Sequence, residues 1–273
     1  MTTLGRTWQL FKQSFNVLSE EPSLLVFPIL TAVSALLLMA VFFVPLYRLG
    51  VFQSIFHRTA TWDDYLPLFS WYYANTFVVV FFNSALTACV NIRLSGGAPT
   101  LADGVRVAAG RLPRIAAWTL LSGTVGLLLR GIENHQKAGR LLTSIVGAGW
   151  TMVTYLIIPV VIIEDRSLPA SVRRSIELLR KTWGEQIAGG FGFGLLGVLL
   201  VLPGFALGVI LLPLSAGLGL SVIVTYILML AAVFGAARGI FTVALYRYAT
   251  DGQPPLGFSR DAFGAPPQPS PAY

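Results

Sequence analysis

The pattern of apolar and charged positions divides the chain into long apolar runs that alternate with short charged segments. The longest run, residues 187–237, contains no Asp, Glu, Lys, Arg or His. Because a helix needs about 20 apolar residues to cross the hydrocarbon core, this run predicts two membrane-spanning helices joined by a tight turn. The complete set of predicted spans is residues 24–44, 68–90, 113–131, 141–163, 187–212 and 214–245.

The third predicted span is the shortest, because its uncharged run covers only residues 115–129. Arg114 and Arg130 stand at its two ends, where long basic side chains can reach toward the interfaces and lengthen the usable helix. If this segment does not cross, it becomes re-entrant and the topology changes. With it, the sequence predicts an all-α integral membrane protein of six spans within residues 1–250, and a disordered, proline-rich cytoplasmic tail over residues 251–273.

A second pattern, with helical spacing, precedes the first, third and fifth spans. Apolar residues three or four positions apart form one face of a helix, and they predict interfacial helices over residues 4–19, 100–112 and 168–183. Thr100 and Asp103 are placed like a capping box. The stripes are Leu4, Trp8, Phe11 and Phe15, then Leu101, Val105, Ala108 and Leu112, then Val172, Ile176, Leu179 and Trp183.

A chain breaker follows each predicted interfacial helix: Pro22, Pro113 or Gly184. An interfacial helix and the hairpin after it would make one repeating unit, and three consecutive units predict a pseudo-threefold bundle. Alternatively, linkers beside a membrane become amphipathic without common ancestry. The sequence leaves both interpretations open.

Lys and Arg are distributed unequally between the two sides that six spans define. Thirteen lie on the side of both termini and five on the other, while Arg238 falls inside the last apolar run and is counted with neither. Since basic residues favour the cytoplasmic side, both termini are predicted to be cytoplasmic. The composition, rich in Arg, Ala, Gly and Val, is typical of a GC-rich bacterial genome, so the expected location is the bacterial inner membrane.

Composition changes the picture only by excluding other classes of protein. The chain has 55% hydrophobic and 11% charged residues, whereas about a quarter of the residues in soluble domains are charged. Its net charge of +7 does not indicate nucleic acid, because the basic residues are scattered between apolar runs. Anionic lipid headgroups are the expected partners, and a homo-oligomer or a partner membrane protein stays open. Cys89 is the only cysteine, so no intramolecular disulfide can form.

Polar residues inside spans are costly and are therefore candidate site residues. On the second span, four of them follow helical spacing and predict one stripe that faces the bundle interior. Hydrogen bonding between helices is the simpler interpretation, and a polar path for a solute is the alternative. The stripe consists of Thr76, Asn83, Thr87 and Asn91.

Arg238 is the most informative single residue. It precedes Arg247 by nine positions, so a continuous helix places it about 13 Å further into the membrane at a rise of 1.5 Å per residue. The favoured interpretation is this continuous helix, and the competing one ends the span at Ala237. A buried Arg238 needs an acceptor, and the candidates are Asn83, Asn91, Glu164 and Asp165.

Two further sets of residues predict contacts with lipid or between helices. The third interfacial helix carries Arg173, Arg174, Arg180 and Lys181, with Glu177 at pairing distance from Arg173 and Lys181. These basic residues suit anionic headgroups, or alternatively a soluble partner. Glycines four residues apart allow helix backbones to approach closely, and Pro203 is expected to kink the fifth span. The glycine pairs are Gly190 and Gly194, Gly204 and Gly208, and Gly235 and Gly239.

Catalytic chemistry has little support in the sequence. His57 and His135 are the only histidines, both lie in predicted loops, and neither belongs to a metal-site motif. We therefore expect no metal and no cofactor, and an enzyme is disfavoured.

Three segments carry a resemblance to a known family: residues 81–86 (FFNSAL), 178–186 (LLRKTWGEQ) and 244–252 (ALYRYATDG). On these motifs the chain resembles a bacterial family of polytopic membrane proteins whose domain is of unknown function. More remotely, its plan looks like the membrane domain attached to some glycerophosphodiester phosphodiesterases, without their catalytic domain. The resemblance implies a membrane fold and no particular activity.

Three functions are therefore compared. The favoured one is a non-enzymatic scaffold or accessory protein of the membrane. The alternatives are a small transporter or channel lined by the second, fifth and sixth spans, and a protein that binds anionic lipid.

Overall fold

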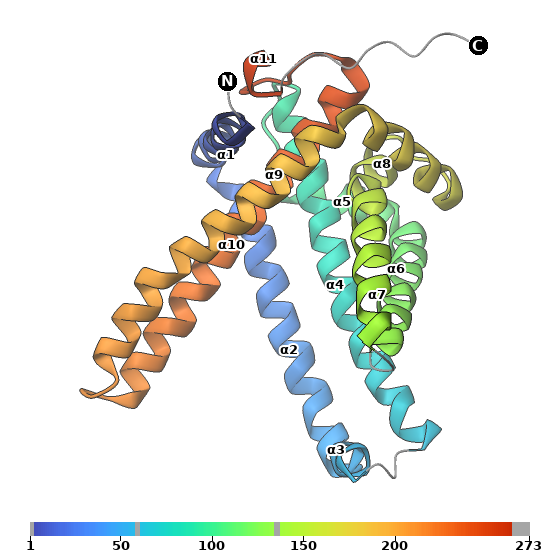
Figure 1. Cartoon of the computed structure of the whole chain (residues 1–273), viewed down its shortest axis with the longest axis vertical. Coiled ribbons are helices and arrows are strands. Elements are labelled where there is room, and N and C mark those ends of the chain that lie inside the picture. The colour runs from blue at the N-terminus through green and yellow to red at the C-terminus, as the bar shows by residue number, and fades with distance from the viewer. Residues whose placement is uncertain (1–2, 58–60, 134–136, 264–273) are drawn as a thin grey trace.

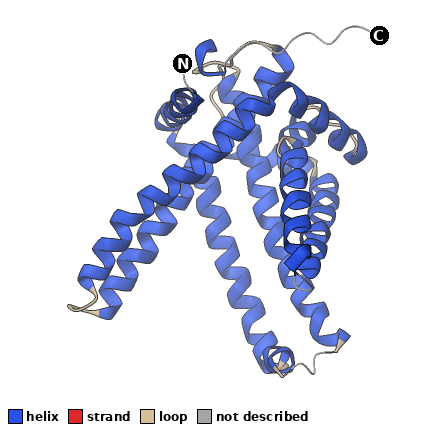
Figure 2. Cartoon of the chain, in the orientation of Figure 1, coloured by secondary structure: helices blue, strands red, loops and turns tan. Residues whose placement is uncertain are grey.

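The structure, a computed structural model, describes residues 3–57, 61–133 and 137–263 of the chain. Every regular element within these ranges is helical (Figure 2), and Figure 1 shows how the helices are arranged. The elements are α1 (Thr3–Glu20), η1 (Pro22–Leu25), α2 (Val26–Arg48), α3 (Val51–Phe56), α4 (Trp62–Leu94), α5 (Leu101–Gly110), α6 (Leu112–Glu133), α7 (Lys137–Thr154), α8 (Ile157–Ile163), α9 (Leu168–Leu211), α10 (Ala216–Asp251) and α11 (Arg260–Phe263).

Five segments of the described chain are long and apolar enough to cross a membrane, so this is a multi-pass helical membrane protein by helix length and composition. They correspond in place to five of the predicted spans. The remaining predicted span, residues 187–212, lies in α9, where the described apolar segment is the shorter Gly197–Leu211. A crossing by α9 therefore stays a prediction. The five segments are Pro22–Arg48, Asp63–Leu94, Leu112–Leu129, Val146–Ile163 and Ala216–Asp251.

α9 differs from the sequence prediction because it is one continuous helix. The prediction ended an interfacial helix at residue 183 and placed a break at Gly184, yet α9 runs from Leu168 to Leu211. A single glycine in a helix interior costs only about 1 kcal/mol relative to alanine, which neighbouring contacts can offset. The basic segment and the apolar segment therefore belong to one continuous helix.

The predicted span over residues 141–163 is instead divided into α7 and α8, with Tyr155 and Leu156 in a turn between them. The cause is Pro159, which has no N–H to donate to the carbonyl of Tyr155 and whose ring would clash with it in a continuous helix. Proline is tolerated in the first turn of α8. Ser175 of α9 donates a hydrogen bond of 2.5 Å to the carbonyl of Val153 at the end of α7.

The helices before the predicted hairpins pack partly as expected. Thr100 and Asp103 form the predicted capping box at the start of α5. Small residues, however, make the contact of α5 with α4: a Cβ added to Gly104 would lie 2.6 Å from Cys89 Sγ. Leu101 and Val105 of the predicted stripe remain 37% exposed, so the larger side chains of that stripe face outward.

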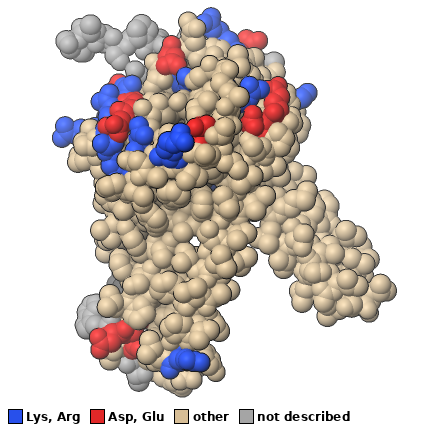
Figure 3. All heavy atoms as spheres, turned by 180° about the vertical axis from the view of Figure 1, so that it is seen from behind, with Lys and Arg blue, Asp and Glu red and all other residues tan. Residues whose placement is uncertain are grey.

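The buried core gathers at one end of the molecule, which also carries most of the charge. Figure 3 shows Lys, Arg, Asp and Glu around α1, α11 and the start of α9, a wide uncharged band below them, and a smaller charged group at the opposite end. We call the first of these the charged end. Five helices meet there through fully buried side chains: Leu10, Phe27, Leu86, Leu178 and Ile240. Lipid tails are as apolar as these side chains, so moving an apolar side chain from lipid into the protein gains little free energy. Burial of apolar side chains is more favourable at an end of the molecule that water reaches.

The distal halves of α9 and α10 form an arm, residues 197–230, that extends away from α2 and α4 (Figure 1). Within the arm the two helices contact each other closely. The Tyr226 hydroxyl donates a hydrogen bond of 2.8 Å to the carbonyl of Leu200. Large apolar side chains cover its outer surface, among them Ile210 at 72% and Leu214 at 80% exposure.

Candidate functional site

A polar pocket at the charged end is the candidate site. Its volume is about 450 Å³. Residues from α4, α8, α9 and α10 and from the loop between α8 and α9 contribute to its wall, so it forms only when these segments are assembled. The lining residues are Asn91, Ile163, Glu164, Arg166, Arg174, Tyr246, Arg247, Thr250 and Asp251.

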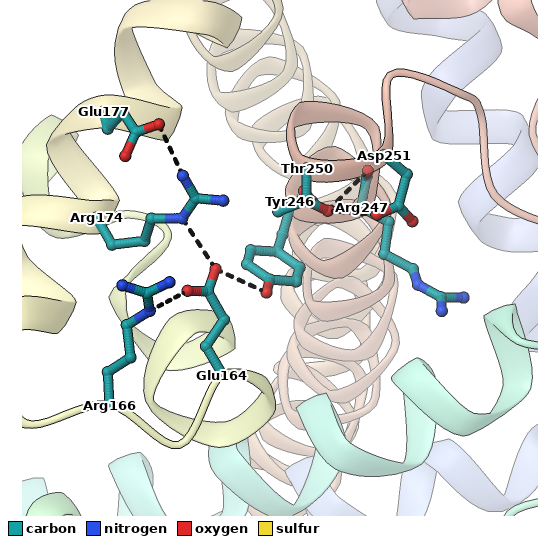
Figure 4. A network of polar contacts seen from close by, with 8 residues as sticks. All are labelled: Glu164, Arg166, Arg174, Glu177, Tyr246, Arg247, Thr250 and Asp251. Atoms are coloured by element: carbon teal, nitrogen blue, oxygen red, sulfur yellow. Dashed lines mark hydrogen bonds and ion pairs between the residues drawn. The ribbon is translucent and has the colours of Figure 1, made fainter.

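Glu164 is the centre of the polar network on one side of this pocket (Figure 4). Its Oε1 accepts hydrogen bonds from Arg174 Nε at 3.1 Å and from the Tyr246 hydroxyl at 3.0 Å. Arg166 Nε lies 2.5 Å from its Oε2 as an ion pair. The Glu164 side chain is only 14% exposed, so its charge needs these partners. Glu164 thus joins the end of α8 to both α9 and α10.

The backbone at Asp165 lets two consecutive carboxylates face different helices. Asp165 has φ 55°, in the left-handed region that Asp tolerates better than most residues. Its carboxylate pairs with Arg114 in the first turn of α6 and lies 3.5 Å from Nε of Arg111, the residue between α5 and α6. The hydrogen bond from Arg114 holds the pKa of Asp165 below its ordinary value. The loop after α8 therefore ties α6 as well as α9 and α10.

The other side of the pocket offers groups that are not paired. Figure 4 shows Tyr246 directed toward Glu164 and Arg247 directed away from it, with no partner drawn for Arg247. No ion pair involves Arg247 in the part of the chain that the structure describes. Asn91 Oδ1 is buried and has no hydrogen-bond partner there. Among the described residues, the pocket wall therefore contains a guanidinium without an ion-pair partner and a buried acceptor without a hydrogen-bond partner.

The predicted polar stripe on the second span does not line one path. Asn83 is exposed, and Thr87 is 6% exposed. Thr76 donates its hydroxyl hydrogen bond to the carbonyl of Tyr72 in its own helix. Only Asn91, at the charged end of α4, belongs to the pocket.

Arg238 lies in a continuous helix, as the favoured interpretation predicted, because α10 runs unbroken from Ala216 to Asp251. The candidate acceptors applied only to a buried Arg238, and this side chain is not buried. Its guanidinium carbon lies 5.9 Å from the centre of the Tyr155 ring, and its side chain is exposed. Glu164 and Asp165, two of the candidate acceptors, pair with other arginines. The turn between α7 and α8 brings the aromatic ring to this arginine.

The basic segment of α9 is divided between two roles. Arg173 and Arg180 are exposed and stay candidates for contact with headgroups. Arg174 points inward and binds Glu164, and its Nη1 lies 2.7 Å from Glu177 Oε1. Glu177 therefore has Arg174 as a partner, which the sequence prediction did not name. The side chain of Lys181 lies outside the described residues.

The glycines predicted to allow close helix packing contact different neighbouring helices. A Cβ added to Gly204 would lie 2.0 Å from Tyr226, and one added to Gly208 would lie 2.1 Å from Ile223, so both allow contact between α9 and α10. At Gly239 the added Cβ would lie 2.6 Å from Leu86 of α4, and Gly235 faces Pro28 of α2 at an ordinary 3.8 Å. Side-chain surroundings at Gly190 and Gly194 lie outside the described part.

Sequence reasoning did not identify Glu164, Tyr246, Thr250 or Asp251 as members of one site. A signal was present, since Glu164 follows an apolar run directly and the other three fall within the family segment at residues 244–252. In the described ranges no three His, Cys, Asp or Glu side chains are grouped as a metal site. The chemistry that the pocket offers is hydrogen bonding and charge.

Comparison with known proteins places the chain in a family. No curated protein and no solved structure matches it. A family described as of unknown function (DUF6159) matches residues 63–256, which is more than half of the chain. This range includes every residue that lines the pocket. The chain therefore belongs to this family of unknown function.

Proposed function

We propose that this protein is a non-enzymatic scaffold of the bacterial inner membrane. The observation that supports the proposal is the set of ion pairs that connects distant segments at the charged end. Arg93 of α4 lies 2.8 Å from Glu20 of α1, Asp165 binds Arg114 in the first turn of α6, and Glu164 binds α9 and α10. Ion pairs and hydrogen bonds between distant segments favour one fixed arrangement of the helices. A fixed arrangement suits a protein that holds other molecules in place better than one that alternates between two conformations.

Packing between α4 and α10 supports a static role. Gly239 of α10 lies against Leu86 of α4 so closely that a methyl group would not fit, and Leu86 is 1% exposed. A polar path between these two helices would need space at this position. The contact therefore favours a scaffold over a carrier that uses the second and sixth spans.

The proposed architecture has six spans in three hairpins, α2 with α4, α6 with α7 and α8, and α9 with α10. In each unit a helical segment at the charged end precedes the hairpin: α1, α5 and the first half of α9. Both termini are then cytoplasmic. The likeness to the membrane domain of glycerophosphodiester phosphodiesterases extends to this plan and to no activity.

Flux measurements test the scaffold. We expect proteoliposomes that contain the protein to pass protons, K⁺ and Cl⁻ no faster than empty liposomes. Spin labels at Ser70→Cys on α4 and Val146→Cys on α7, both exposed positions, should report one distance that a proton gradient does not change. Native Cys89 is buried and should not compete for the label. A flux that Arg238→Ala abolishes would replace the scaffold with a transporter.

Labelling with a membrane-impermeant maleimide tests the six spans. Phe56→Cys and Leu214→Cys, at positions 84% and 80% exposed, should react in intact cells from outside. Leu256→Cys, 60% exposed, should react only after the membrane is opened. If Leu214→Cys also required opening, α9 and α10 would enter and leave on one side and the six-span topology would be wrong.

A further inference from the structure

The charges that line the pocket do not cancel. Three arginines and two carboxylates contribute to its wall, so the lining carries one net positive charge. Arg174 and Arg166 are both engaged by Glu164. Among the described residues of the lining, Arg247 is therefore the cation without an ion-pair partner. A guanidinium has five N–H donors in a fixed plane, a geometry that suits phosphate oxygens.

Besides this cation, the pocket lining contains oxygen acceptors that can take further hydrogen bonds. Asn91 Oδ1 is buried without a hydrogen-bond partner, and leaving such an atom unsatisfied is costly. Asp251 adds a carboxylate, which in the described residues accepts only the hydroxyl hydrogen bond of Thr250, at 3.0 Å. A ligand that fits both sides has an anionic group for Arg247 and N–H or O–H donors for Asn91 and Asp251.

The position and size of the pocket narrow the class of ligand. It lies at the charged end, next to the uncharged band that Figure 3 shows, which is the level of phospholipid headgroups if that band lies in the hydrocarbon core. Its volume of about 450 Å³ is within the range of small-molecule sites. A phosphate group with a short substituent that carries N–H or O–H groups supplies a negative charge for Arg247. The substituent supplies hydrogen-bond donors for Asn91 and Asp251.

We propose that this pocket binds a phosphate ester that carries a hydrogen-bond donor, such as a phosphoethanolamine group, as part of a phospholipid or as a free compound. Arg247 binds the phosphate, and Asn91 and Asp251 accept hydrogen bonds from the ammonium group. The proposal goes beyond the scaffold role and does not depend on it.

Native mass spectrometry with two zwitterionic lipids tests the donor. Phosphatidylethanolamine and phosphatidylcholine have the same phosphate and the same net charge, but the choline group has no N–H. We expect phosphatidylethanolamine to bind about tenfold more tightly, the effect of one satisfied hydrogen bond. Asn91→Leu should reduce this preference, since Asp251 remains as the second acceptor, and leave phosphatidylcholine binding unchanged. Equal affinity of the native protein for both lipids would overturn the role of the donor.

A charge-matched pair of variants tests the cation. Arg247→Gln should weaken phosphatidylethanolamine binding by about tenfold or more, since a charge-assisted hydrogen bond is lost. Arg106→Gln removes the same charge at a side chain 78% exposed and outside the pocket, and should bind like the native protein. If Arg247→Gln does not fold, Arg247→Lys keeps the charge and should bind with intermediate affinity.

Competition identifies the source of the ligand. Displacement of the lipid by soluble phosphoethanolamine indicates a free phosphate ester, whereas retention of the lipid indicates a membrane headgroup, and either result supports the phosphate site. Undiminished phosphatidylethanolamine binding by folded Arg247→Gln would overturn it.

Discussion

Replacing Glu164 with alanine is expected to lower the free energy of unfolding by about 3 kcal/mol, because removal of one partner from a largely buried ion pair leaves the other charge uncompensated. Arg174, whose side chain is 21% exposed, would keep only its surface partner Glu177. The Tyr246 hydroxyl would lose its acceptor. Unfolding in mild detergent, followed by a thermal shift or by steric trapping, measures the loss.

Matched variants separate the buried pair from surface charge. Glu177→Gln removes a carboxylate that also binds Arg174 but is 53% exposed, and it should cost less than about 1 kcal/mol, as surface pairs do. The double variant Glu164→Ala with Arg174→Ala should be less destabilised than the sum of the single variants, because no unpaired buried charge remains. Equal effects of Glu164→Ala and Glu177→Gln would show that the network does not hold these helices together.

Elements that depend on local sequence were predicted well. Apolar runs predicted, close to their positions in the structure, the five segments that are long and apolar enough to cross a membrane, since the required length follows from bilayer thickness. The Thr100 capping box depends on residues three apart and was also correct. The continuity of Arg238 with the rest of α10 was correct for the same reason.

Contacts between distant segments could not be predicted from periodicity. The Arg93–Glu20 pair joins residues 73 positions apart, and the partner of Arg238 proved to be Tyr155, which the turn before Pro159 brings into place. Glycine in particular has no fixed role. Gly184 did not end a helix, and the sequence around Gly239 does not indicate that the helix it packs against is α4. Only the neighbouring backbone decides what a glycine does.

The close contact inside the arm leads to the second large effect that we expect. Gly219→Ala would place a Cβ 2.7 Å from the carbonyl oxygen of Gly208, and this neighbour is backbone that cannot rotate away. α9 and α10 must then separate, at a cost of about 1–3 kcal/mol. Separation would also weaken the hydrogen bond from the Tyr226 hydroxyl to the Leu200 carbonyl. No water is available in the apolar surroundings of the arm to replace this hydrogen bond.

Gly197→Ala is the matched control, because its Cβ would meet only the Phe234 ring at 3.8 Å, an ordinary contact. Alanine favours a helix over glycine by about 1 kcal/mol, so this variant should be as stable as the native protein or slightly more so. The two substitutions thus have opposite expected signs although the chemical change is the same. Unfolding free energies, together with the distance between spin labels at Ile210→Cys and Leu218→Cys, measure both effects. An unchanged label distance in Gly219→Ala would mean that the arm is held together by something other than backbone contact at its glycines.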